Sequence, residues 1–338
     1  MKPVPVNSVK SDSLLNSDTA LNSRKKSKRA SSRAADDSSE LEKDNRHTGN
    51  ACQQPSSQPV AQHPKFDHRR WRAELSLSYK KSRGRSVISR REHVGPLLVQ
   101  KPFYPEGDEV CHTYILHPPG GVVGGDQLTI NVTVETDAHA LLTTPASTKF
   151  YRCDDRHAVQ TQNLHVADKA CLEWLPQDTI LFDQARVKTT TKVELAAQAK
   201  FIGWEILCLG RPASGELYNN GFCRQAFEIR QDGKPVLIER SALIGGSELL
   251  SAQWGMAAYT VMGVMVVSQA NNTLLDLARA VEPVKNGHSS ASLIDNLLVC
   301  RCLASQGIEA REYFTRIWQA VRKDWNGRSA VVPRIWYT

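Results

Sequence analysis

The sequence lacks an uninterrupted apolar run of about 18 residues, the length that a membrane-spanning helix needs. Its first residues, MKPVPVNSVKSDSLLNSD, also lack the apolar segment and small-residue cleavage site of a secretory signal. No Cys-x-x-Cys pair is present, and the eight cysteines are scattered along the 338 residues. These absences predict a cytoplasmic protein with reduced thiols, without a disulfide framework and without a membrane segment.

The common motifs of metal, nucleophile and nucleotide chemistry are missing as well. There is no His-Glu-x-x-His, no Gly-x-Ser-x-Gly and no Gly-x-Gly-x-x-Gly. Cys300 and Cys302 form a Cys-x-Cys pair inside an apolar segment, which is more typical of core thiols than of a soft-metal site. The sequence therefore gives no positive sign of an enzyme, and we expect no stably bound cofactor.

Residues 1–65 differ in composition from the rest of the chain. They are rich in Ser, Asn, Gln, Asp and Lys, and their few apolar residues have no period, so we expect disorder. The basic cluster SRKKSKR, from Ser23 to Arg29, is either a localisation or docking signal or an ordinary solvated stretch. The segment holds 11 Lys/Arg and 7 Asp/Glu, half of the chain's net charge of +8. The basic balance is therefore weak evidence for nucleic-acid binding.

Residues 66–338 are predicted to form one mainly β domain. Strict alternation in LTINVTV, which begins at Leu128, places its four aliphatic residues on one face of a half-buried strand. Similar short patterns recur at intervals of about ten residues, as in packed-sheet proteins. Between two of them, QDGK from Gln231 to Lys234 has hairpin-turn chemistry. We expect packed β-sheets in an elongated β-rich body, and we find no internal repeat.

The last part of this domain, about residues 256–326, predicts strand, helix, strand and helix in turn. NNTLLDLARAVEP, from Asn271 to Pro283, has helical apolar spacing. GIEAREYFTRIWQAVRKDW, residues 307–325, has the strongest amphipathic pattern, with Arg322 among the charged residues off its apolar stripe. We thus expect about two α-helices near the C-terminus. Trp318 and Trp325, on that stripe, either cover a sheet or bind a partner, for which we select them.

A glycine-rich corner, PPGGVVGGD, ends at Asp126 and contains Gly120, Gly121, Gly124 and Gly125. The first and last glycines have the spacing of a phosphate-binding P-loop, but an acid follows where that loop has lysine. The corner also leads into a strand, so it offers no helix N-terminus to an anion. Glycines permit positive φ and close backbone approach, which predicts a structural turn. Asp126 either bonds to the backbone of this turn or borders open space.

Two further acids stand inside apolar strand patterns: Glu205 in KFIGWEILCLG and Glu239 in PVLIERSAL. A carboxylate in a dry core is costly unless it is paired or hydrated. These acids therefore have cationic partners, such as an arginine near Glu239, or they line a wet passage. Oxygen ligands along a wet passage suit transient handling of a divalent cation.

Several long segments resemble the urease accessory protein family UreD, also called UreH: GPLLVQKPFYPEGDEVCHTYILHPPGGVVGGDQL, HALLTTPASTKFYR, LEWLPQDTILFDQA, FIGWEILCLGRPASGE and the terminal PRIW. The resemblance runs from about Trp71 to Thr338. It implies a non-catalytic, mainly β scaffold that binds the urease apoprotein, UreF and the GTPase UreG in a hetero-oligomeric complex, dimerised if at all through its partners. It further implies that Ni²⁺ passes in transit through an interior passage towards the urease active site.

The resemblance also implies which residues line that passage. Asp126, Glu205 and Glu239 lie on the matching segments as oxygen ligands for nickel in transit, and Thr148 lies on one as a lining residue. The chain departs from the family in its N-terminal extension and at Ser147. Two other hypotheses stay open: a β-sandwich enzyme with its site in TPASTKFYRCDDRH, and a nucleic-acid binder that uses the basic tail. We expect neither nucleic acid nor membrane as a partner.

Overall fold

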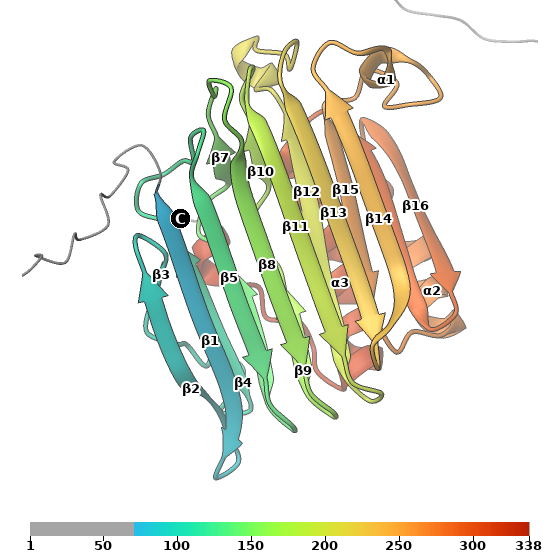
Figure 1. Ribbon diagram of the computed structural model, residues 1–338. Coiled ribbons are helices and arrows are strands. Elements are labelled where there is room, and N and C mark those ends of the chain that lie inside the picture. Colours follow the sequence, from blue (N-terminus) through green and yellow to red (C-terminus); the bar gives the residue numbers. More distant parts are fainter. Residues whose placement is uncertain (1–70, 338) are drawn as a thin grey trace, which may run out of the picture. The chain divides into compact units, whose positions relative to one another are not determined.

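A computed structural model of the chain describes residues 71–337. The predicted disordered segment 1–65 and its basic cluster lie outside the described residues. Two β-sheets pack face to face, and two helices cover the outer face of the second sheet (Figure 1). The mainly β fold class is thus confirmed. Among the described residues, no helix has the length and apolar character needed to cross a membrane.

The first sheet has seven strands in the order β14-β13-β11-β8-β5-β1-β2. The bounds are β1 (Arg72–Ser82), β2 (Arg85–Val94), β5 (Gln127–Val134), β8 (Ala158–Val166), β11 (Arg186–Leu195), β13 (Phe222–Gln231) and β14 (Lys234–Ile244). Its inner strands pair in parallel, and an antiparallel hairpin closes each edge. In the predicted QDGK turn, Asp232 and Gly233 both have positive φ, as a two-residue hairpin turn requires.

The second sheet runs in the order β16-β17-β15-β12-β9-β6-β4-β3, with β10 pairing with β12 and β7 pairing with β10. The bounds are β3 (Leu98–Val99), β4 (Val110–Leu116), β6 (His139–Thr143), β7 (Thr148–Phe150), β9 (Cys171–Trp174), β10 (Thr179–Leu181), β12 (Lys200–Leu209), β15 (Val261–Val267), β16 (Gly287–Ile294) and β17 (Leu297–Ala304). The helices are α1 (Glu248–Ser251), α2 (Asn272–Ala280) and α3 (Gly307–Asn326), with short 3₁₀ turns η1 (Pro212–Ser214) and η2 (Arg334–Tyr337). The predicted strand-helix-strand-helix order at the end of the chain is present as β15, α2, β16–β17 and α3.

The chain alternates between the two sheets in successive coils. Strands β5, β8 and β11 of the first sheet are followed by β6, β9 and β12 of the second, and both sets stack in parallel. The structure therefore repeats although the sequence has no visible repeat. Backbone hydrogen bonds hold the parallel strands together. Each coil therefore needs only inward-facing apolar residues and a turn, and the coils need not repeat the same sequence.

Two hydrophobic cores result from this arrangement. One fills the space between the sheets and includes Leu75, Val132 and Phe201, and the other lies between the second sheet and helices α2 and α3. Strand β12 lies between the two cores, which is why KFIGWEILCLG is apolar on both faces. Phe201 and Leu207 face the first core and Trp204 the second. This alternation places Glu205 on the side of the inter-sheet core.

Helix α3 anchors its apolar stripe on the second sheet. Trp318 and Trp325 are buried, and their indole nitrogens donate to Glu173 and to the Ser268 carbonyl. Their side chains therefore belong to the sheet-helix core and offer no surface to a partner in this structure, in contrast to the partner-binding role for which we selected them. Arg322, expected on the solvated side of the helix, is fully buried, because acids on the sheet below draw it inward.

Candidate functional site

A cavity of about 180 Å³ lies between the two sheets. The loop 144–149 and Gly120 line one end of it, and the side chains of Glu205 and Gln225 line its interior. Its polar lining comes from both sheets and from the loops beside them: His117, Thr144, Ser147, Thr148, Lys149, Gln160, Gln162, Gln177, Thr179, Thr189, Glu205 and Gln225. The space between the sheets is thus apolar over most of its area and polar around this cavity.

The register of three strands explains the polar lining. Gln160 of β8, Thr189 of β11 and Gln225 of β13 are ladder partners, so their side chains form one row on the inner face of the first sheet. Parallel in-register strands place partner side chains about 4.8 Å apart on the same face. The row therefore presents amides and a hydroxyl to the second sheet, from which Glu205 projects towards it.

Glu205 is the acidic residue of the cavity lining. The Thr191 hydroxyl donates a hydrogen bond to one carboxylate oxygen, and the Gln225 amide donates to the other at 2.5 Å. Burial raises the pKa of Glu205 above its usual range, against these two hydrogen bonds, and the charge of Glu239 raises it further. No ion pair involves Glu205 among residues 71–337. A buried carboxylate with neutral donors and no counter-ion is ready to accept a cation.

Thr148, at the start of β7, lines the same cavity as Glu205. Its backbone N–H donates to the Asp178 carbonyl at 3.0 Å, and the neighbouring Ser147 hydroxyl donates to the Asp178 carboxylate at 2.9 Å. These bonds hold the loop against β10. The structure therefore places Thr148 and Glu205 in the lining of the same cavity.

Asp126 lies outside the cavity lining. One of its oxygens accepts the Trp71 backbone N–H at 3.2 Å, and the other accepts the Val123 N–H at 3.1 Å. Both contacts close the glycine corner onto the start of β1. The observed role is the turn-stabilising one that the sequence pattern left open.

Glu239 also lies outside that lining, towards the β14 edge of the first sheet. It forms an ion pair with Arg301 of β17, which links the two sheets. The side chains are 25% and 44% exposed, so solvent reaches the pair. An arginine partner was one of the two possibilities that the sequence left open for this acid.

The glycine corner is a structural turn whose four glycines have different environments. Gly120 and Gly125 adopt positive φ. A side chain at Gly121 would overlap the Tyr151 ring, and one at Gly124 would press on Cys153. Two of the glycines thus permit the backbone conformation, and two permit close packing on the segment after β7.

Sequence reasoning missed a second buried polar cluster, centred on Arg322. Its guanidinium contacts both oxygens of Glu173 on β9 at 2.8–3.1 Å and both oxygens of Glu106 at 2.7 and 2.9 Å. His112 contacts Glu106 at 2.6 Å. The side chains of Arg322, Glu173 and His112 are fully buried. The cluster ties α3 to the second sheet and to the loop before β4.

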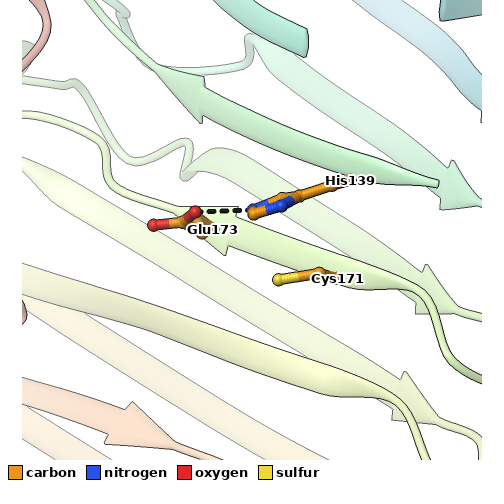
Figure 2. Close-up of side chains that lie close together, drawn as sticks. All are labelled: His139, Cys171 and Glu173. Carbon is orange, nitrogen blue, oxygen red and sulfur yellow. Dashed lines mark hydrogen bonds and ion pairs between the residues drawn. The ribbon is translucent and has the colours of Figure 1, made fainter. Parts of the chain in front are cut away.

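His139 and Cys171 extend this cluster towards the strand ends, as Figure 2 shows. Nε2 of His139 lies 2.6 Å from Glu173, and the ligand atoms of these three residues lie within 4.8 Å of one another. Such a set has metal-ligand chemistry, but Arg322 and the Trp318 indole already occupy the carboxylate. The charge that a metal ion would supply is therefore present in the protein, and we assign the cluster a structural role.

The pKa shifts of this cluster predict a pH window for stability. Burial alone would raise the pKa of Glu173, but His139 and Arg322 lower it from 4.5 to about 2. Burial alone would lower the pKa of His139, but Cys171 and Glu173 raise it from 6.5 to about 10. The contribution of Glu173 is present above 4.5 and lost as the pH falls towards 2. The contribution of His139 is present below 6.5 and lost as the pH rises through 10. Urea unfolding should show the cluster's full contribution between about pH 4.5 and 6.5. His139→Gln should remove the alkaline dependence and weaken the acidic one, because His139 also lowers the pKa of Glu173.

A signal for this cluster is present in the sequence. Glu173 interrupts the apolar run ACLEWL just as Glu205 interrupts its own strand. The same criterion selects both acids, but it does not distinguish a paired carboxylate from an unpaired one. That distinction depends on Arg322, which is 149 residues away in the sequence.

Comparison with known proteins assigns the family. A profile described as UreD urease accessory protein matches residues 72–337. The chain is 43% identical over 277 residues to the urease accessory protein UreD of Escherichia coli, covering 79% of this chain and 97% of that protein. It is 42% identical over 270 residues to UreD of Citrobacter koseri, covering 80% and 93%. UreD of Methylobacillus flagellatus is 40% identical over 272 residues, with 80% and 95% covered.

The profile match spans both sheets, the cavity between them and helix α3. The chain therefore belongs to the UreD family of urease accessory proteins.

Proposed function

We propose that this protein is a non-catalytic scaffold for urease maturation that lets Ni²⁺ pass through the cavity between its sheets. In this proposal the chain binds the urease apoprotein together with UreF and the GTPase UreG. Nickel is cargo and not a resident cofactor. Binding places the cavity on the route of the ion, and the protein contributes position and ligands rather than a chemical step.

The observation that carries the proposal is the unpaired carboxylate of Glu205 inside the polar cavity. Glu205 forms no ion pair among the described residues, so a cation that enters the cavity can form one with it. Neutral amide and hydroxyl groups around the carboxylate replace part of the ion's hydration without binding it irreversibly. A closed thiolate site would retain the ion, whereas one carboxylate with neutral neighbours favours transit. Lys149 lines the same cavity but forms no ion pair with Glu205 in the described chain.

The other three residues predicted for the passage, Asp126, Thr148 and Glu239, take supporting parts in this view. The Asp126 oxygens are engaged by backbone N–H groups, so this acid keeps the shape of the corner beside His117 and Gly120. Thr148 lines the path near the loop. Glu239 lies beyond Glu205 and is held by Arg301.

The test is Glu205→Gln in cells that co-express the chain with urease and the other accessory proteins. The amide keeps the size and hydrogen-bonding capacity of the side chain but loses its charge. We expect the nickel content of purified urease to fall about tenfold or more, the effect of losing about 1.4 kcal/mol of cation stabilisation. Nickel is measured by elemental analysis, and complex assembly by co-purification.

Glu194→Gln is the matched control, because Glu194 is a half-exposed acid of β11 that lies outside the cavity lining. It should leave nickel content unchanged. Normal nickel content with Glu205→Gln, in complexes that assemble normally, would refute the passage.

A further inference from the structure

The cavity does not extend to both edges of the described sheets. Its lining includes Glu205 and Gln225 but neither Phe227, Glu239 nor Arg301. Phe227 lies on β13, Glu239 on the edge strand β14 of the first sheet, and Arg301 on β17, next to the edge strand β16 of the second. On the first sheet, Thr191, Phe227 and Glu239 are ladder partners in one row, and Thr191 contacts Glu205. Glu239 is thus two strands beyond the hydroxyl that binds Glu205, about 10 Å away.

The second sheet carries a matching row. Glu205 of β12 pairs with Val264 of β15, and Val264 pairs with Arg301 of β17. Arg301 is therefore on the same inner face as Glu205, also two strands away, and its guanidinium reaches across to Glu239. Each row thus holds one acid, Glu205 at the cavity end of the second sheet's row and Glu239 at the outer end of the first sheet's row, and Arg301 pairs with the outer acid.

The pair is poorly suited to be a stabilising contact alone. Both side chains are partly exposed, and ion pairs of this kind contribute about 0–1 kcal/mol because water and salt screen them. Arg301 nevertheless lies inside a strand whose neighbouring inward residues, Val299 and Leu303, are apolar. Its charge has a direct electrostatic effect, since a guanidinium repels a divalent cation and competes with it for the same carboxylate oxygens.

We propose that Arg301 closes the β14–β17 end of the passage by occupying Glu239, and that a divalent cation passes this end only when Arg301 releases that carboxylate. The inference rests on the proposed passage. It adds that, at this end of the passage, the Arg301 guanidinium competes with the metal ion for the Glu239 carboxylate. In the closed state Glu205 is the one unpaired acid of the two rows. With Arg301 displaced, Glu205 and Glu239 together form a two-carboxylate path for a hard or borderline divalent cation such as Ni²⁺.

The test is a double-mutant cycle on the Ni²⁺ affinity of the full-length chain, measured by equilibrium dialysis against nickel chloride at fixed pH and salt. Arg301→Gln should tighten binding about tenfold, because the oxygens of Glu239 become available. Glu239→Gln alone should change the affinity less than twofold, because Arg301 already occupies this acid. The double variant should return to the wild-type value. Such non-additivity is the signature of competition for one carboxylate.

Arg301→Lys is the matched control, since it keeps the charge at the same position and should stay within about threefold of wild type. Urea titration shows whether Arg301→Gln is folded. If it is unfolded, Arg301→Lys takes its place in the test. In that case an affinity gain of tenfold in Arg301→Lys, or a tenfold loss in Glu239→Gln alone, overturns the inference.

If Arg301→Gln is folded, two results overturn the closing role of Arg301. One is a Ni²⁺ affinity equal to that of the wild type. The other is a higher Ni²⁺ affinity that persists when Glu239→Gln is added. These results would leave the passage itself intact. The passage fails separately, if Glu205→Gln leaves urease fully loaded with nickel.

Discussion

Arg322→Met is expected to lower the free energy of unfolding by about 3–5 kcal/mol, since it leaves two buried carboxylates without their cation. Glu106 and Glu173 are almost fully inaccessible, and each has both oxygens bound to the Arg322 guanidinium. Methionine fits a similar volume but cannot compensate either charge. Because α3 is held to the second sheet at this point, its last turns should detach first. Urea titration of the full-length chain measures the loss.

Arg316→Met is the matched control on the same helix. Arg316 is only half-buried and donates to a single carbonyl, that of Glu282, at 3.3 Å. Its replacement should cost less than about 1 kcal/mol. Combining Arg322→Met with Glu106→Gln and Glu173→Gln should recover part of the loss, because the uncompensated charges are then removed. Equal losses for Arg322→Met and Arg316→Met would contradict the importance of this cluster.

Glu205→Gln is expected to stabilise the protein near neutral pH by about 1–3 kcal/mol, because it removes a desolvated carboxylate that has hydrogen bonds but no ion-pair partner among the described residues. The raised pKa of Glu205 means that its carboxyl group binds a proton more tightly in the folded protein than in the unfolded chain. The stabilising contribution of this proton is present below the ordinary value of 4.5 and lost as the pH rises through the folded pKa. Glutamine does not titrate, so the advantage of the variant should grow with pH. Urea midpoints at several pH values measure it.

The same substitution should therefore improve stability and reduce nickel transfer, which is the expected result when a part-buried charge is retained for function. Glu194→Gln, in contrast, should shift the urea midpoint equally little at every pH because this acid is half-exposed. If Glu205→Gln destabilises the protein at alkaline pH, then Glu205 has a cationic partner or a role in packing, and it is not the unpaired acid of the cavity.

Local pattern was sufficient for most of the secondary structure. The alternation from Leu128 to Val134 predicted β5, and the apolar stripe of residues 307–325 predicted α3 to within one residue at its end. These patterns are read over a few residues and depend on burial of one face. The predicted end of α2 was later than the observed one, since the helix stops at Ala280, three residues before Pro283.

The side-chain partners were less predictable. Arg322 was placed on the solvated side of its helix because arginine is usually exposed, but the acids beneath it lie on β9 and in the loop before β4. Trp318 and Trp325 were selected for a partner on the strength of size and position near the chain end. Their burial depends on how α3 sits on the sheet, which no local pattern specifies.

The sequence by itself determined the β-rich body, the C-terminal helices, the turn at the glycine corner and the family, because each depends on residues near one another in the chain or on similarity along its length. It also marked Glu205 and Glu239 as acids in apolar strands. Only the tertiary structure decided which acids are paired. Glu239 forms an ion pair with Arg301 and Glu173 forms one with Arg322, whereas Glu205 has no counter-ion among residues 71–337. Charge compensation is set by distances of a few ångströms between strands and helices far apart in sequence, and the stacking of the coils fixes those distances.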